Sequence, residues 1–179
     1  MRVLLRALEV EDYKTSVFWR NDPEVWAKTG GNAFFVSSEQ EKNWVENAIF
    51  DHKNDIRLAI CMIKDSCYIG NVYLNSIHWI NRSAEFSIFL GDKTHWGEGF
   101  GTEATLLMLK YGFDQLGLER IFLLVLEENA SAIKVYQKCG FHTEGTLRRS
   151  IYKDGEFKSQ ILMSILKTEF KKISERHGL

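Results

Sequence analysis

The chain has few of the features that mark several large classes of protein. It holds only three cysteines, Cys61, Cys67 and Cys139, and this odd number without metal-ligand spacing indicates no metal site. No apolar run approaches the length of a membrane span, and no apolar segment near the N-terminus is typical of a secretory signal. We therefore expect a protein of the reducing cytoplasm.

The chain has no excess of positive or negative charge. The 23 Lys and Arg residues against 24 Asp and Glu residues give a formal net charge of −1. A protein dedicated to nucleic acids or to anionic membranes normally shows a basic excess or a clustered basic face. We expect neither a nucleic acid nor a membrane as a partner.

The sequence also has no linker, repeat or low-complexity segment. Its 179 residues, 45% of them hydrophobic and 26% charged, are ordinary for a soluble globular protein. This length is sufficient for a substantial core and is short for two domains. We expect a single domain over residues 1–179.

The hydrophobic pattern predicts an α/β fold. Its first part predicts strands at 3–7, 56–63, 67–79 and 82–90, and helices at 9–19 and 38–50. Ser38, with Glu41 three residues later, predicts a capping box for the second helix. The second part predicts a helix containing Ala104 and Met108, a buried strand at 121–126 parallel to 82–90, a helix after Asn129, and a hairpin of 141–152 with 156–166. Together these elements predict a mixed central sheet with helices on both faces.

The most informative segment is FLGDKTHWGEGFGTEA, residues 89–104. An apolar run leads into Gly97, Gly99 and Gly101, and then into an amphipathic helix. Glycine permits positive φ and a close approach of backbone N–H groups to an anion, to which a helix N-terminus adds its unpaired donors. The segment predicts a pyrophosphate site, with a tight turn that binds no ligand as the alternative.

The spacing of the glycines excludes two common phosphate motifs. The segment lacks the Gly-Lys-Ser/Thr of a P-loop and the G-x-G-x-x-G of a dinucleotide fold. WGEGFG, residues 96–101, resembles instead the acetyl-CoA signature R/Q-x-x-G-x-G/A of the GNAT N-acetyltransferases. Trp96 stands where that pattern has Arg or Gln, a change that leaves the backbone donors in place.

Two further segments extend this resemblance over nearly the whole chain. NASAIKVYQKCGF, residues 129–141, resembles the GNAT stretch N-x-x-A-x-x-x-Y-x-x-x-G-F. EGTLRRSIYKDGEF, residues 144–157, is similar to the branch that includes ribosomal-protein N-terminal acetyltransferases and spermidine acetyltransferases. Ser159 departs from that branch, which often has Asp there. The resemblance implies the GNAT fold and transfer of an acetyl group from acetyl-CoA to an amine, without a metal.

The resemblance also implies where acetyl-CoA binds. The pantetheine arm pairs with the strand before the glycine turn, and we interpret Leu90–Gly91 as part of a bulge that frees N–H groups. Asn129 caps its helix, contacts the pantetheine, or does both. The expected cofactor-binding residues are Phe89, Leu90, Gly91, Trp96, Gly97, Glu98, Gly99, Phe100, Gly101, Thr102, Asn129 and Lys134, with Lys134 and Lys138 either near the 3′-phosphate or simply solvated.

Tyr136 and Glu85 are the expected catalytic residues. A phenol with an ordinary pKa of about 10 is a competent proton donor to a CoA thiolate, whose ordinary pKa is about 8.5. Tyr136 lies on an apolar helical stripe, so a core tyrosine is the alternative. Glu85, in an apolar strand, is the expected base, directly or through water. A salt bridge to Arg82 or Arg57 is the alternative role, and His78 and His95 are alternative bases.

The acceptor region is rich in aromatic residues, and we expect Trp19, Trp26, Phe34 and Phe35 to line it. Such a lining suits a sugar ring, an aliphatic amine or a peptide terminus. Glu24, Glu39, Glu41 and Glu46 favour a polyamine, whereas the WRNDP segment, residues 19–23, is similar to acetyltransferases of nucleotide-linked amino sugars. A protein N-terminus is a third acceptor, a non-catalytic acyl-CoA-binding protein is the alternative of another class, and a homodimer is left open.

Overall fold

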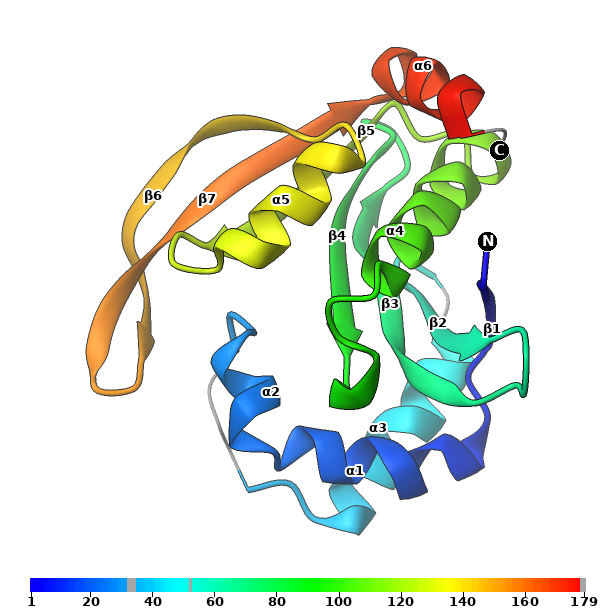
Figure 1. Ribbon diagram of the computed structural model, residues 1–179, viewed down its shortest axis with the longest axis vertical. Coiled ribbons are helices and arrows are strands. Elements are labelled where there is room, and N and C mark those ends of the chain that lie inside the picture. The colour runs from blue at the N-terminus through cyan, green and yellow to red at the C-terminus, as the bar shows by residue number, and fades with distance from the viewer. Residues whose placement is uncertain (32–34, 52, 178–179) are drawn as a thin grey trace.

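The structure, a computed structural model, describes residues 1–31, 35–51 and 53–177 (Figure 1). The strands of these residues form one seven-stranded sheet in the order β1-β2-β3-β4-β5-β7-β6. Neighbouring strands are antiparallel except for β4 and β5, which are parallel as expected. The strands are β1 (Val3–Ala7), β2 (Ile56–Met62), β3 (Tyr68–His78), β4 (Ser83–Leu90), β5 (Arg120–Leu126), β6 (His142–Lys153) and β7 (Glu156–Leu166).

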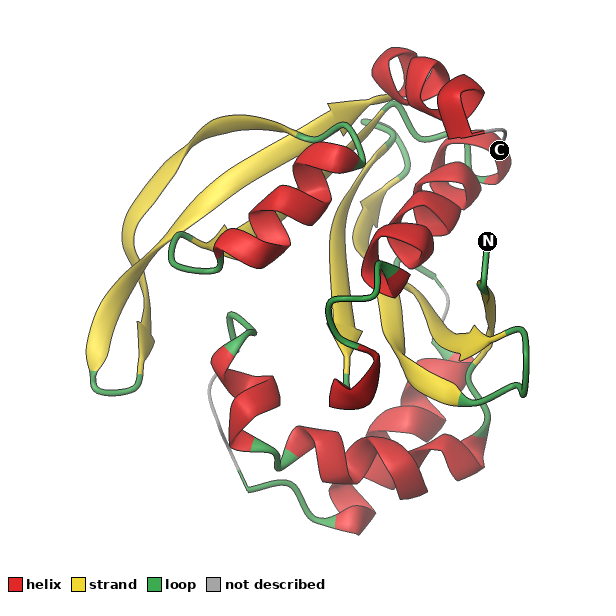
Figure 2. Cartoon of the chain, viewed as in Figure 1, coloured by secondary structure: helices red, strands yellow, loops and turns green. Residues whose placement is uncertain are grey.

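Helices cover both faces of the sheet (Figure 2). The main core lies between the sheet and α4, α5 and α6, with Phe113 after α4 packing on Phe170 of α6 at 5.2 Å. On the opposite face α3 places Trp44 against Tyr73 at 6.1 Å. The helices are α1 (Tyr13–Arg20), α2 (Pro23–Ala27), α3 (Ser38–Phe50), α4 (Phe100–Lys110), α5 (Ala130–Lys138) and α6 (Lys167–His177). No helix of the described residues has the length and apolar character to cross a membrane.

The parallel pair β4–β5 is short, and this shapes the molecule. Only Ser83–Glu85 of β4 pairs with Arg120–Phe122 of β5. Beyond these residues β4 continues along β3, and β5 continues along β7. The sheet therefore opens between the two strands at their carboxyl ends, which leaves one edge of each strand available to a ligand.

The hairpin of β6 and β7 extends away from the main core as an arm (Figure 1). Asp154 and Gly155 have φ values of 53° and 84°, the pattern of a two-residue type I′ turn. Beside this turn, the Lys153 side chain is buried and its Nζ donates to the carbonyls of Trp26 and Gly31, each at 2.9 Å. These bonds fasten the tip of the arm to the end of α2.

Two expectations about the helices were wrong or incomplete. The capping box of α3 uses Ser37 and Gln40 rather than Ser38 and Glu41. Both spacings satisfy the motif, but the observed choice frees the carboxylate of Glu41 to turn inward, where it is 1% exposed. The short helix α2 and the C-terminal helix α6 were not expected.

Candidate active site

A cleft with a volume of about 690 Å³ occupies the opening between β4 and β5. Residues 86–90 of β4 and 124–126 of β5 form two of its walls, and α5 and the turn before α4 form others. The end of α1 and residues 25–31 close the remaining side. Successive side chains of β4 lie on opposite faces of the sheet, so the cleft is accessible from both faces.

The glycine turn is built to present backbone donors to this cleft. Gly97 and Gly99 have φ values of 79° and 91°, in the left-handed region that favours glycine. Gly99 is the N-cap of α4 and has no side chain to bond the first-turn N–H groups. These donors stay open at the positive end of the helix dipole, an arrangement suited to a phosphate group.

Two side chains brace the turn from outside. The Nη2 of Arg2 donates to the Glu98 carbonyl at 2.7 Å, and its guanidinium lies 4.2 Å from the Phe100 ring centroid. The indole Nε1 of Trp96 donates to the Leu90 carbonyl at 2.9 Å. Arg2 was not anticipated from the sequence, because its partners lie about a hundred residues away. Its bonds and that of Trp96 fix the turn to the residue before β1 and to the end of β4.

The end of β4 has the bulge that we expected, with Gly91 and Asp92 together opposite Ile69, but it does not free N–H groups. The N–H groups of Gly91 and Asp92 both donate to the Ile69 carbonyl, at 3.0 and 3.1 Å, so neither is free for a ligand. Gly91 does not line the cleft; a Cβ at this position would overlap the Trp19 indole. Because peptide groups alternate along a strand, those of Ile88 and Leu90 point away from β3 and toward the cleft.

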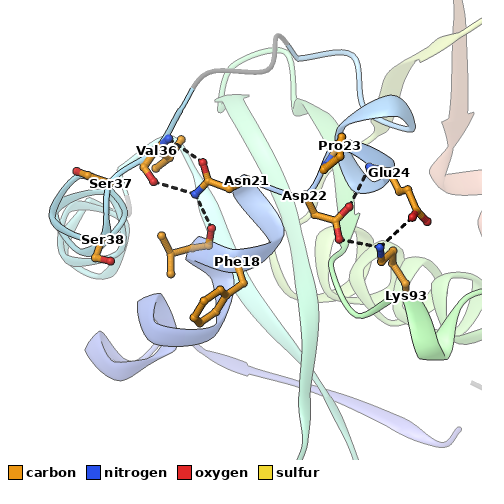
Figure 3. Close-up of a pocket in the computed structure, with 10 residues that line it drawn as sticks. Phe18, Asn21, Asp22, Pro23, Glu24, Val36, Ser37, Ser38 and Lys93 are labelled. Atoms are coloured by element: carbon orange, nitrogen blue, oxygen red, sulfur yellow. Dashed lines mark hydrogen bonds and ion pairs between the residues drawn. The ribbon is translucent and has the colours of Figure 1, made fainter.

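A separate hollow beside the cleft couples the segment before the glycine turn to α2 (Figure 3). Lys93 Nζ lies 2.8 Å from Asp22 and 3.3 Å from Glu24, and Asp22 also accepts the Glu24 N–H as the N-cap of α2. The bond from Lys93 lowers the pKa of the Asp22 carboxyl. Both carboxylates in this hollow are thus engaged by one lysine.

Helix α5 brings the second motif to the cleft. Asn129 Oδ1 accepts from the Ala132 N–H at 3.1 Å, which confirms its role as an N-cap. Its Nδ2 donates to the Lys28 carbonyl at 2.9 Å, so this amide also ties α5 to the end of α2. Lys134 and Lys138, one turn apart, both line the cleft.

Tyr136 lies in the same wall. Its ring packs against Phe86 and Phe141 at 6.1 and 5.8 Å and is 8% exposed. The hydroxyl has no hydrogen-bond partner within the described residues, in which every fully buried polar side-chain atom has one, so its oxygen is open to the cleft. Burial raises the pKa of Tyr136, which keeps the phenol protonated at neutral pH.

A family model described as an acetyltransferase (GNAT) domain matches residues 2–142, most of the chain. The chain belongs to the GNAT acetyltransferase family. Relatives include the spermidine N(1)-acetyltransferase of Escherichia coli K12, 36% identical with 94% of this chain and 88% of that protein covered. An uncharacterized N-acetyltransferase p20 of Bacillus licheniformis is 32% identical, with 94% of this chain and 95% of that protein covered.

A solved GNAT structure resembles this one over nearly its whole length. It is the spermidine N-acetyltransferase of Vibrio cholerae in complex with CoA and spermine, with a TM-score of 0.87 and 29% identity. The match covers 95% of this chain and 98% of that one. With the family match, it shows that the chain has the GNAT fold and is an acetyl-CoA-dependent N-acetyltransferase.

The residues present fit the cosubstrate of a GNAT enzyme. Two left-handed glycines and an open helix N-terminus suit the pyrophosphate of acetyl-CoA, and the two lysines of α5 suit a further phosphate. Of the twelve residues expected to bind it, all but Gly91 and Glu98 line the cleft. The backbone carbonyl of Glu98 accepts a hydrogen bond from Arg2, and its side chain does not line the cleft. Within the described residues no group of three or more His, Cys, Asp or Glu side chains could hold a metal ion.

Glu85 is half-buried on β4 but does not line the cleft. The salt bridges considered for it do not form, because Arg82 pairs with Glu119 at 3.5 Å and Arg57 pairs with Asp55 at 2.6 Å. Within the described part of the chain, its carboxylate has neither a hydrogen bond nor an ion pair. The alternative role of Glu85, a salt bridge to Arg82 or Arg57, was therefore wrong. Its role as a base stays a prediction.

Of the other two candidate bases, one lies in the cleft and one outside it. His95 lines the cleft, with Nδ1 3.1 Å from Asp92. His78 lies outside the cleft, where its Nδ1 accepts the Asn81 N–H at 3.0 Å. His78 therefore holds a turn.

The expected acceptor residues are only partly in place. Trp26 lines the cleft, and its Nε1 donates to the Arg20 carbonyl. Trp19 is 9% exposed and supports the site from behind, packing on Tyr68 at 4.8 Å. Phe35 is fully exposed and outside the cleft, and Phe34 lies outside the described residues. Arg20 and Tyr73, which no sequence motif marked as acceptor residues, also line the cleft.

Proposed function

We propose that the enzyme transfers the acetyl group of acetyl-CoA to a primary amine by direct attack, with both substrates held together in the cleft. The observation that carries this proposal is that the Tyr136 hydroxyl is open to the same cleft as the donors of the glycine turn. The candidate acceptors are a small amine, a nucleotide-linked amino sugar and a protein N-terminus. The relatives named for spermidine make a polyamine the first small amine to test.

In this proposal the chain first binds and orients the cosubstrate. The N–H groups around Gly99 bind the pyrophosphate, and Lys134 and Lys138 bind the 3′-phosphate. The cleft-facing peptide groups of Ile88 and Leu90 bond the pantetheine amides, as an added strand would. Holding both substrates in one cleft removes much of the entropic barrier to their reaction.

Two side chains then move protons. Acetyl-CoA supplies an activated thioester, whose carbonyl carbon the amine attacks. Tyr136 donates its phenolic proton to the departing thiolate sulfur, since burial keeps this phenol protonated until that bond breaks. Glu85, half-buried and unpaired, accepts the amine proton through water, because its carboxylate lies outside the cleft lining.

Release of CoA from acetyl-CoA, measured with a panel of amines, tests the proposal. The panel contains spermidine, an amino sugar and a peptide with a free N-terminus, and we expect turnover with at least one. Thermal stabilisation by acetyl-CoA without turnover of any amine would favour the non-catalytic acyl-CoA-binding protein. Absence of stabilisation would contradict both functions.

Two further points complete the proposal. The three free cysteines support a reducing compartment, the cytoplasm. Exposed apolar side chains on the arm, Leu147, Tyr152 and Phe157, support association of two copies. Light scattering of the purified protein tests this homodimer, and a monomer at micromolar concentration would contradict it.

A further inference from the structure

Arg20, the last residue of α1, lines the cleft from the end that α1 and α2 close. Its guanidinium carbon lies 5.1 Å from the ring centroid of Trp44 and 5.9 Å from those of Trp26 and Phe89. Its Nε donates to Glu41 Oε2 at 3.3 Å. Among the residues that the structure describes, none bonds the two terminal nitrogens, and 27% of the side chain is exposed.

The Glu41 carboxylate holds Arg20 without being available to a ligand. Glu41 is 1% exposed, and its other oxygen accepts from Ser16 Oγ at 2.6 Å. The pair fixes the guanidinium at its Nε edge and leaves the opposite edge free. A fork of two parallel N–H groups is the geometry with which arginine binds carboxylates and phosphates.

The described lining of the cleft contains no carboxylate. Its charged side chains are Arg20, Lys28, Lys134 and Lys138, and Glu85 lies outside. A polyamine needs carboxylates or open aromatic faces. Here the Arg20 guanidinium already lies 5.9 Å from the ring centroids of Trp26 and Phe89, two aromatic residues of the lining. Lys134 and Lys138 are assigned to the 3′-phosphate, so the described lining offers an acceptor the cations of Arg20 and Lys28 and no carboxylate that would bind a polycation.

We propose that the acceptor amine carries an anionic group, a carboxylate or a phosphate, which Arg20 binds through its two terminal nitrogens. This proposal rests on acetyl transfer in the same cleft. Arg20 lies next to Phe89, which stands between Ile88 and Leu90, whose peptide groups face the cleft. An acceptor held by its anion at Arg20 is thereby directed along β4 toward the cofactor.

Matched pairs of amines test this assignment. The pair glucosamine 6-phosphate and glucosamine differs by a phosphate, and the pair γ-aminobutyrate and butylamine differs by a carboxylate. We expect kcat/KM to be about 10- to 100-fold higher for at least one anionic member than for its neutral partner, the range for a charge-assisted hydrogen bond. The pair that responds identifies the anion, and we expect spermidine to be the poorest acceptor.

The variant Arg20→Gln/Glu41→Gln removes both partners together, so that no unpaired charge stays buried. We expect it to lose the preference for anionic amines through KM. The control Lys42→Gln/Glu46→Gln removes an exposed ion pair of α3, also with no net change in charge, and should keep the preference. A preference for spermidine in the wild type, or an anion preference that survives in the double variant, would overturn the proposal.

If no amine is acetylated, the proposed function fails, and calorimetry with CoA-loaded protein decides on Arg20 separately. Tighter binding of an anionic amine than of its neutral partner, lost in the double variant, supports the assignment. Equal binding of both partners in both pairs overturns it.

Discussion

At the scale of single residues, the cleft is marked by polar groups that the fold leaves without partners. The Tyr136 hydroxyl and the terminal nitrogens of Arg20 face it, and the Glu85 carboxylate lies close by on β4. Elsewhere in the described residues, each fully buried polar side-chain atom has a hydrogen bond. Groups that are open and unpaired are available to substrates, so substitutions at these positions should alter catalysis more than stability.

Tyr136→Phe should lower kcat by about 10²-fold, the usual scale of general acid catalysis, because only the proton donor is removed. The ring and its contacts with Phe86 and Phe141 are kept, so acetyl-CoA affinity should stay unchanged. Tyr111→Phe, which removes a hydroxyl outside the cleft, is the matched control. A wild-type kcat in Tyr136→Phe, with chemistry limiting, would make Tyr136 a core residue and leave the acid elsewhere.

Glu85→Gln should change the free energy of unfolding by no more than about 0.5 kcal/mol, because the carboxylate has no ion pair to lose. If Glu85 accepts the amine proton, kcat/KM should fall most for amines of high pKa, and the acid limb of the pH profile should shift or flatten. Melting curves and pH–rate profiles of this one variant measure both effects. An unaltered profile would remove Glu85 from the mechanism.

At the scale of helices and strands, local signals were sufficient for much of the fold. The hydrophobic pattern predicted the strands β2, β3 and β4, and α4 and α5 follow from helical periodicity. The N-cap of α3 was predicted one residue too late, because Ser37 and Ser38 both satisfy the capping motif. The burial of Glu41 against α1 decides between the two. Long-range partners of this kind are not encoded in a local pattern.

The same limit applies to the site. Motifs in the sequence pointed to the glycine turn and Tyr136, and both line the cleft, because such motifs depend on local backbone and spacing. Arg20 was missed because its function depends on partners in α3 and β4, far away along the chain. Trp19 was expected in the lining but packs behind it, since α1 turns its indole onto Gly91.

One ion pair between strands makes stability depend on pH. Arg120 of β5 binds both oxygens of Glu144 on β6, and Ser164 Oγ of β7 donates to the same carboxylate at 2.6 Å. The Arg120 hydrogen bond and then that of Ser164 lower the pKa of Glu144 to about 2. A lowered pKa stabilises the folded state above the ordinary value of about 4.5, and this stabilisation is lost as pH falls toward 2.

Glu144→Gln should therefore unfold with a weaker pH dependence than the wild type between pH 5 and about 2. The difference should be roughly 0.5–1 kcal/mol, since the pair is partly exposed to solvent. Urea unfolding across this pH range measures it. Glu46→Gln, whose partner Lys42 is 4.0 Å away on an exposed helix face, serves as control. Parallel pH curves for wild type and Glu144→Gln would exclude this role.

At the scale of the whole molecule, the active site is a consequence of how the sheet divides. Because β4 and β5 pair over only three residues each, the sheet opens where the glycine turn, α5 and the end of α2 meet. Lys153 and Asn129 hold the end of α2 to the arm and to α5. The fold thus brings the glycine turn and the proposed acceptor residues into one cleft.

The most direct test of this account is calorimetric binding of acetyl-CoA to Gly99→Val, compared with Gly117→Val. Both glycines have positive φ, 91° and 67°, so each substitution imposes a similar backbone strain of about 1–2 kcal/mol. Only Gly99 lies in the proposed pyrophosphate site. We expect Gly99→Val to fold and to weaken acetyl-CoA binding by about 100-fold, or about 2.7 kcal/mol, while Gly117→Val binds as the wild type does. Wild-type affinity in a folded Gly99→Val would contradict the assignment of the glycine turn as the cofactor site.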